Sequence, residues 1–407
     1  MQNLLKKAIS PLKFFISDSR STGVLLLFCT ALSLILSNTI GIGYRSFWIN
    51  EIHYNLGFNL PHSCLKWIND FLMAIFFLFA GMEIKRELID GELSGFKKAI
   101  LPFAAALGGM IVPALIFISF NATSGFVHGW GIPTATDIAF SIGIASLLGK
   151  RVPASLKIFL MALAIIDDLG AIVVITLFYG STINWYVLFL AVFVYGLLWL
   201  CNIKKIKPGI IQAVLGFALW YIVFNSGVEA SISGVLIAFA MPVNCLPKLE
   251  KMLHKVVNFG ILPLFVLANT AILIPGDMAA ALRSTISVGV VVGLVIGKPV
   301  GIFLFSKIMI RLKIAKLPLN TSLKQLLGMG FLAGIGFTMS IFTSTLAFPG
   351  EEARDIAKIS ILISLGVSII LSNIYFKIIK QPALPIKQIL KKSPLPVSKN
   401  VVIEQTD

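Results

Sequence analysis

Long apolar runs recur along the whole chain, and they constrain its fold more than any other feature. Each run has about 20 residues, the length that an α-helix needs to cross a bilayer, and short polar breaks separate the runs. Only 13% of the residues are charged, against roughly 25% in soluble domains. A soluble fold with so few charges would expose large apolar patches, so lipid must be the main solvent. We therefore predict an all-α integral membrane protein embedded in the lipid bilayer.

The runs and breaks predict about twelve transmembrane helices in a single domain, residues 1–380. The predicted helices lie near 22–42, 67–84, 99–120, 126–148, 155–179, 184–201, 209–224, 227–243, 254–275, 285–310, 325–348 and 357–379. Beyond this domain, residues 381–407 are basic and rich in proline, which predicts a disordered cytoplasmic tail.

The basic residues predict the orientation of the chain. With a cytoplasmic N-terminus and twelve crossings, 28 of the 34 Lys and Arg residues lie on the inner side and five lie outside. The positive-inside rule describes this asymmetry, and a wrong number of crossings would mix the two sets. Both termini are therefore expected in the cytoplasm. The net charge of +16 comes from small clusters of Lys and Arg between the apolar runs, not from a basic domain. These clusters orient the protein in the membrane, so we expect no nucleic-acid partner.

The first outer loop, residues 43–66, is the longest. Residues 52–60 alternate apolar and polar side chains around an Asn/Gly centre, which is typical of a β-hairpin, here placed near 45–61. An isolated hairpin is marginal in water, so pairing with the hairpin of a second protomer would stabilise it. An irregular surface loop explains the same pattern equally well.

Four charged side chains fall deep inside predicted spans. Asp137, Asp167 and Asp168 lie near the midpoints of two of them, and Lys298 lies at the midpoint of a third. A charge at the bilayer centre costs roughly 2.5–3.5 kcal/mol on insertion scales. A structural salt bridge could pair one carboxylate with Lys298, but one ammonium group cannot neutralise three carboxylates. The surplus negative charge indicates a bound cation, a proton or both.

Two of the predicted spans are interrupted at their middle. Pro133 precedes Asp137 in the first, and Gly334 and Gly336 interrupt the second. Non-helical backbone at this depth is tolerated only where it is buried in protein or lines a watery cavity. Asp137 could offset the positive N-termini of the half-helices, and Lys298 the negative C-termini. Close helix packing is an alternative explanation for the glycines, but it explains Pro133 less well.

The interrupted spans are the middle members of two three-helix sets. The sets start seven spans apart, an odd number, so they cross the membrane in opposite senses. Inverted repeats with discontinuous helices are typical of secondary transporters. The chain has no phosphate-binding GxxxxGK(S/T) sequence and no cysteine pair with metal-ligand spacing. We therefore expect neither an ATP-driven pump nor a cofactor.

Five sequence blocks surround the charged and interrupted positions. The stretch at 159–172, which contains the two adjacent aspartates, reads FLMALAIIDDLGAI. The other four are GMEIKREL at 81–88, TDIAF at 136–140, IGKP at 296–299 and GIGFTMS at 334–340. The block at 159–172 is similar to the signature of the NhaA family of bacterial sodium/proton antiporters, and the other four resemble that family in the same order.

The resemblance implies that Asp167 and Asp168 form the ion and proton site, and that Asp137 and Lys298 balance the crossed helix dipoles. It also implies a homodimer joined through the outer hairpin, in the bacterial inner membrane. The implied reaction is electrogenic exchange of internal Na+ or Li+ for a larger number of external protons. This is transport, so the resemblance implies a protein that is not an enzyme.

The resemblance further implies a region for pH regulation. Glu83 and Glu250, with His254, match the cytoplasmic acidic region of the family. The chain departs from the best-known members at Glu229, where they carry a histidine. Histidine titrates near neutrality and glutamate does not, so the pH range of activation need not match theirs.

The residues also suggest a mechanism. Oxygen ligands suit a hard cation, so Asp168 is expected to be the main Na+ ligand, helped by Thr136 and by Asp137. Asp167 is expected to pair with Lys298 in the proton-loaded state and to lose that partner when sodium arrives. Burial disfavours the charged form of both groups, so either could release the second proton.

Two other functions remain open on the sequence alone. A symporter for organic anions could share crossed helices, but it would need a roomier polar cavity. An intramembrane aspartyl protease would also use two buried aspartates, which must come from facing helices. Such proteases usually carry a Gly-x-Gly-Asp sequence, which this chain lacks.

Overall fold

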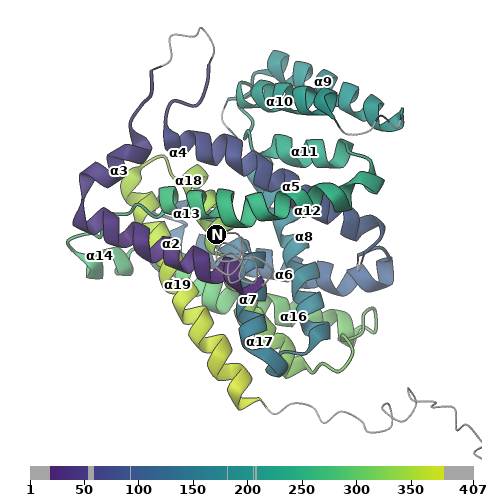
Figure 1. The fold of residues 1–407 in the computed structure, drawn as a ribbon. Helices are drawn as coiled ribbons and strands as arrows, with labels where there is room; N and C mark the ends of the chain where they lie inside the picture. The colour runs from purple at the N-terminus through teal and green to yellow at the C-terminus, as the bar shows by residue number, and fades with distance from the viewer. Residues whose placement is uncertain are drawn as a thin grey trace, which may run out of the picture.

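The described part of the chain is entirely helical (Figure 1). The computed structural model describes residues 19–53, 59–91, 93–180, 182–204, 206 and 209–379, and these contain no strand. The helical segments, with short 3₁₀ and π segments written η, are α2 (Ser19–Thr39), α3 (Ile42–Ile49), α4 (Cys64–Lys66), η1 (Trp67–Leu72), α5 (Met73–Ile89), α6 (Phe96–Asn121), η2 (Val127–Thr134), α7 (Ile138–Leu147), η3 (Gly149–Arg151), α8 (Ala154–Phe178), α9 (Trp185–Ile203), α10 (Ile210–Phe224), α11 (Ile232–Ala240), η4 (Val243–Cys245), α12 (Leu246–Val256), η5 (Val257–Ile261), α13 (Leu262–Asn269), α14 (Met278–Arg283), α15 (Thr285–Val292), η6 (Gly293–Gly297), α16 (Lys298–Arg311), α17 (Leu323–Ala333), α18 (Phe337–Ala347) and α19 (Glu351–Ile378).

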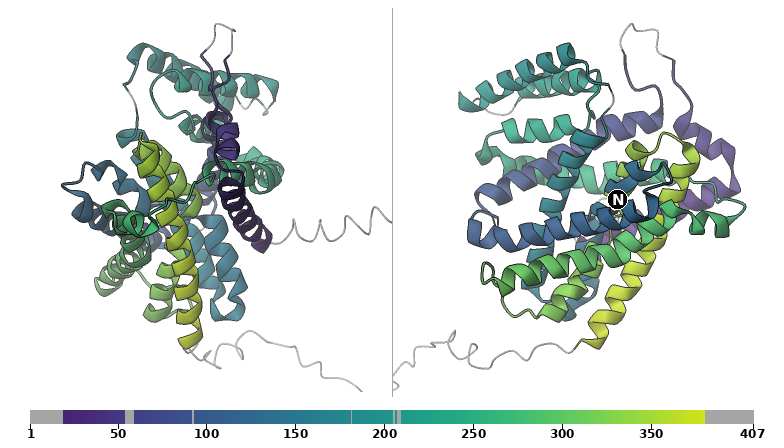
Figure 2. Two further views of the ribbon diagram at one scale, coloured as in Figure 1. Left: turned by 90° about the vertical axis from the view of Figure 1, so that its left-hand side faces the viewer. Right: turned by 180° about the vertical axis from the view of Figure 1, so that it is seen from behind.

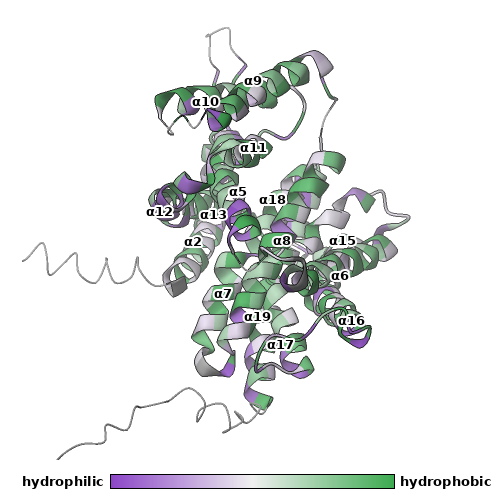
Figure 3. Ribbon diagram, turned by 90° about the vertical axis from the view of Figure 1, so that its right-hand side faces the viewer, coloured by the Kyte–Doolittle hydropathy of each residue, from purple (hydrophilic) through white to green (hydrophobic). Residues whose placement is uncertain are grey.

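Within these residues, eight helices are long and apolar enough to cross a membrane, or nine if the bent pair α17 and α18 counts as one span. Figure 3 shows that the helices are predominantly hydrophobic along their length. The twelve predicted crossings are therefore not confirmed. The other three predicted spans correspond to η2 with α7, to α10 and to α11. The longest of these helices, α10, has 15 residues and spans about 22 Å, which is less than the hydrocarbon core of roughly 30 Å.

The helices form two bundles (Figures 1 and 3). In the first, called the broken-helix bundle, α6 packs on η2, α8, α15 and α16, and α7 packs on α8 and α17. In the same bundle α19 packs on α15, α17 and α18. In the second, called the flanking bundle, α5 packs on α11 and α12, α10 on α9 and α11, and α13 on α2. The bundles meet where α2 contacts α7 and where α5 contacts α8. Arg45 of α3 also joins them, because its guanidinium lies 2.9 Å from Asp355 and 3.2 Å from Glu351 of α19.

Glycines allow the closest approach within the broken-helix bundle, between α6 and α16, which run side by side in the rear view of Figure 2. A Cβ atom on Gly108 would lie 2.3 Å from the carbonyl oxygen of Gly301, so the two backbones are in direct contact. This is the packing that small residues permit between helices in membranes.

The predicted hairpin near 45–61 is not confirmed. Residues 42–49 form α3, in which Tyr44 and Trp48 make an edge contact at helical spacing, with ring centroids 6.1 Å apart. This aromatic contact suits a helix, where residues four apart are neighbours. The amide of Ile52 donates to the carbonyl of His62 at 2.6 Å, and residues 54–58 lie outside the described part of the chain. The predicted disordered tail, 381–407, also lies outside it.

Candidate functional site

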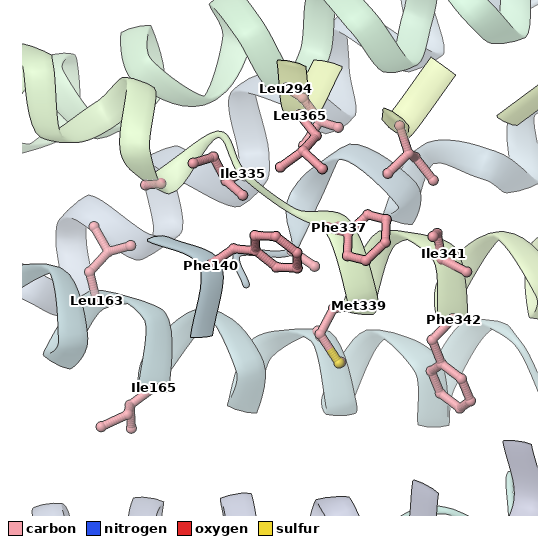
Figure 4. Close-up of a cluster of buried hydrophobic side chains, with 14 of the residues drawn as sticks. Phe140, Leu163, Ile165, Leu294, Ile335, Phe337, Met339, Ile341, Phe342 and Leu365 are labelled. Carbon is pink, nitrogen blue, oxygen red and sulfur yellow. The ribbon is translucent and has the colours of Figure 1, made fainter. Parts of the chain in front are cut away.

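Two interrupted helices meet inside the broken-helix bundle. Residues 135–137 separate η2 from α7, and residues 334–336 separate α17 from α18, which are bent by 51°. The amide of Asp137 donates to the carbonyl of Ile335 at 2.7 Å, so the two interruptions touch. Close by, the rings of Phe140 and Phe337 pack edge to face, with centroids 5.0 Å apart (Figure 4). Both interruptions lie where the sequence predicts them.

Asp137 caps two half-helices at once. Its Oδ1 accepts a hydrogen bond from the amide of Phe140, at the start of α7, at 3.1 Å. Its Oδ2 accepts from the amide and the hydroxyl of Thr338, at the start of α18, at 3.0 and 2.5 Å. One buried carboxylate therefore satisfies donors at two helix N-termini and lies at the positive end of both dipoles.

Lys298 is fully buried at the start of α16, directly after the π segment η6. Its Nζ donates to the carbonyl of Thr134, the last residue of η2, at 2.5 Å, and lies 3.0 Å from Oδ2 of Asp167. The ammonium group thus offsets the C-terminal end of η2 and neutralises one of the two adjacent aspartates. Because Asp167 is also fully buried, this is a desolvated ion pair.

Asp168 points elsewhere. Adjacent residues of a helix point about 100° apart, and Asp168 lines a cavity while Asp167 contacts Lys298 and Thr136. Only 4% of Asp168 is exposed, and its Oδ1 is buried without a hydrogen-bond partner. Burying such an oxygen unpaired is costly, so this atom is available to a cation or a proton.

The cavity has a volume of about 410 Å³ and lies between the two bundles. It runs from the exposed His254 inward to Asp168 and therefore connects the buried carboxylate with one surface of the protein. The broken-helix bundle contributes Thr136, Asp137, Asp168 and Thr338; the flanking bundle contributes Glu83, His254 and Asn258.

Of the three residues predicted for pH regulation, two line this cavity and the third, Glu250, contacts Arg86. Glu83 and His254 line it, and the ring of His254 packs on Phe79 with centroids 6.0 Å apart. Glu250 accepts from Arg86 Nε at 3.0 Å, which connects α12 with α5. Glu229 does not belong to this group: it lies between α10 and α11, and its Oε1 is buried without a hydrogen-bond partner.

Sequence reasoning found Thr136 but missed the other neutral polar residues of the site. Thr338 is in the block that resembles the family, so it could have been found there. Ser141 and Asn258 are isolated polar residues in apolar segments, and nothing in their sequence context distinguishes them from other buried hydroxyls and amides.

Comparison with known proteins gives a consistent result. The family model described as Na+/H+ antiporter 1 matches residues 13–376. The Na(+)/H(+) antiporter NhaA 1 of Clostridium beijerinckii is 44% identical over 396 residues, covering 93% of this chain and 98% of that protein. NhaA of Flavobacterium psychrophilum is 48% identical over 359 residues, covering 86% and 92%. NhaA of Vibrio cholerae is 43% identical over 387 residues, covering 92% and 98%. The chain therefore belongs to the NhaA family of Na+/H+ antiporters, which are membrane transporters and not enzymes, and it exchanges Na+ for H+ without a cofactor.

Proposed function

We propose that Na+/H+ exchange takes place at Asp168, with Thr136 and Asp137 as further oxygen ligands of Na+ or Li+. The orientation of the paired aspartates carries this proposal. Each aspartate has a buried Oδ1 without a hydrogen-bond partner, but only Asp168 lines the cavity. The other oxygen of Asp167 is engaged by Lys298 and Thr136. Carboxylate and hydroxyl oxygens are suitable ligands for a hard cation, and a carboxylate can carry a proton in its place.

The second proton is proposed to come from the ion pair of Asp167 and Lys298. A cation that reaches Asp168 brings positive charge close to Asp167 and competes with Lys298 for it. The pair holds one dissociable proton, on the ammonium group of Lys298, because Asp167 is ionised. When the pair separates, the buried amine loses its counter-charge and can release this proton, because a low-dielectric region disfavours the charged amine. Release of two protons for each Na+ makes the exchange electrogenic.

The open end of the cavity is proposed to face the cytoplasm of a bacterial cell, with the protein as a multi-pass inner-membrane transporter and both termini inside. The positive-inside asymmetry supports this orientation, because Lys251, Lys255 and Arg86 lie at that end, on α12 and α5. The twelve-span topology with inverted three-helix repeats belongs to the same proposal, as does a homodimer formed through residues 45–61.

The pH dependence is proposed to arise at the mouth of the cavity. Glu83 and His254 line the path that an internal ion would take, and the contact of Glu250 with Arg86 holds α12 against α5. Changes in charge here would alter both the local potential and the packing of these two helices.

Transport of an organic anion is less consistent with this site. The cavity lies at the small end of the range of about 300–1,000 Å³ for small-molecule pockets. Its charged lining includes the carboxylates Glu83, Asp137 and Asp168, which would repel an anion.

The decisive variant is Asp168→Asn, with Glu352→Gln on the exposed start of α19 as a control that removes a carboxylate away from the site. Everted vesicles carrying each protein at equal abundance would be tested for Na+- and Li+-driven proton flux with a pH probe. We expect Asp168→Asn to abolish flux while insertion is unchanged, and Glu352→Gln to be active. Flux close to that of the unmodified protein in Asp168→Asn would refute the assignment.

A further inference from the structure

Four half-helix ends meet at the crossing, and they are satisfied in different ways. Asp137 caps the N-termini of α7 and α18, and Lys298 meets the C-terminal end of η2. The C-terminal end of α17 instead accepts hydrogen bonds from neutral donors. The hydroxyl of Ser141 donates to the carbonyl of Leu332 at 2.8 Å, and that of Thr136 lies 3.1 Å from the carbonyl of Ala333.

Thr136 has one hydroxyl proton and two neighbouring acceptors. Its Oγ1 lies 2.5 Å from Oδ2 of Asp167 and 3.1 Å from the carbonyl oxygen of Ala333. A hydroxyl group can coordinate a cation only through its oxygen lone pairs, so its proton must then point away from the ion. The ionised carboxylate of Asp167 and the carbonyl of Ala333 can both accept this proton. The carbonyl does not titrate, so it remains an acceptor for Thr136 whatever the protonation state of Asp167.

Ser141 fixes the position of that acceptor. It is fully buried one turn into α7, and Leu332, to which it donates, directly precedes Ala333. The bond therefore holds the last turn of α17 against the same segment that carries Thr136. Without this bond, the carbonyl of Leu332 at the end of α17 would lose its side-chain donor.

We propose that Ser141 is a positioning residue for the cation site. By holding the end of α17, it keeps the carbonyl of Ala333 where it accepts the Thr136 proton, so that the Thr136 oxygen is turned toward the ion. This inference rests on the proposed role of Thr136 as a ligand. Its consequence is specific: Ser141 affects how tightly Na+ binds and leaves the turnover of the loaded transporter unchanged.

The test compares Ser141→Ala and Ser141→Thr with Ser364→Ala. Ser364 is also fully buried, but its hydroxyl donates within α19, to the carbonyl of Ser360 at 2.7 Å, so its loss controls for removal of a buried hydroxyl. Purified proteins in liposomes would be assayed for Na+- and Li+-dependent proton flux, and Na+ binding would be measured by calorimetry.

We expect Ser141→Ala to raise the KM and the Kd for Na+ roughly threefold to tenfold, the effect of one lost hydrogen bond, with a maximal rate within about twofold of the original. Ser141→Thr keeps a hydroxyl donor and should have the KM of the unmodified protein, as should Ser364→Ala. An unchanged KM in Ser141→Ala, or a fall in maximal rate alone, would overturn the inference. If Ser141→Ala does not fold, Ser141→Cys, a weak donor of similar size, replaces it with the same expected increase.

Thr136→Val separates this inference from the proposed site. An unchanged KM in Thr136→Val would refute Thr136 as a ligand, and the present inference with it. A raised KM there together with an unchanged KM in Ser141→Ala would overturn the role of Ser141 alone. Because Ser141 acts through Thr136, the double variant should bind Na+ no more weakly than Thr136→Val, and an additive loss would contradict the proposed connection.

Discussion

Replacement of Lys298 by methionine tests the buried ion pair by its effect on stability. The ammonium group lies 3.0 Å from Asp167 and 2.5 Å from the carbonyl of Thr134, and both charged side chains are fully buried. Methionine keeps most of the side-chain length and volume, so the cavity contribution is small. What remains is an unpaired carboxylate in a desolvated position, and breaking a buried pair in this way costs about 3–5 kcal/mol.

A second substitution shows whether this cost comes from Asp167. The double variant Lys298→Met/Asp167→Asn carries no charge at either position of the pair, so most of the loss should be recovered. Thermal denaturation of the unmodified protein, Lys298→Met, Asp167→Asn and the double variant in detergent would give the coupling between the two positions. Equal destabilisation of the single and the double variant would refute the reasoning, as would a Lys298→Met protein that melts at the original temperature.

Three further predictions concern the crossing, the packing and the contact between the bundles. Asp137→Ala removes the cap of two helices and should cost roughly 2–3 kcal/mol in thermal denaturation, more than Asp137→Asn, which keeps an acceptor. Gly108→Ala should destabilise by about 1–3 kcal/mol or more because its Cβ would overlap the backbone of α16, whereas Gly366→Ala, with open space around it, should melt normally. Arg45→Gln removes two ion pairs, to Glu351 and Asp355, that are only partly shielded from solvent. We expect a loss below about 1 kcal/mol that disappears in 1 M salt, and a loss that persists at that salt concentration would contradict this view.

The sequence predicts the buried charged residues of the site better than it predicts the outer loop and the number of membrane crossings. Asp137, Asp167 and Lys298 could be identified because a charge inside an apolar run is costly, and Pro133 marks a break because it cannot continue a helix. The partners of these residues are a different matter. That Asp137 also caps α18, and that Ser141 donates to Leu332, depends on contacts between residues 201 and 191 positions apart in the sequence.

The outer loop and the number of membrane crossings are the two features that the sequence predicts least well. Alternation in residues 52–60 predicts strands near 45–61, but residues 45–49 of that range belong to the helix over 42–49. The centre of the predicted hairpin, residues 54–58, lies outside the described part of the chain. Hydropathy also cannot distinguish an unbroken crossing from a half-helix such as α7, because both are equally apolar. Which helices form one bundle depends on shape complementarity between helix faces, and a single sequence does not reveal it.

The shared cap at Asp137 has a mechanical consequence. Because one carboxylate holds the starts of both α7 and α18, turning either half-helix on its own would break bonds to the other. The crossing therefore has few internal degrees of freedom, and we expect it to travel as one rigid unit. The part that can move is then the interface between the broken-helix bundle and the flanking bundle, where the cavity lies. We expect access to Asp168 from the opposite side of the membrane to arise from sliding or rocking of one bundle against the other at this interface.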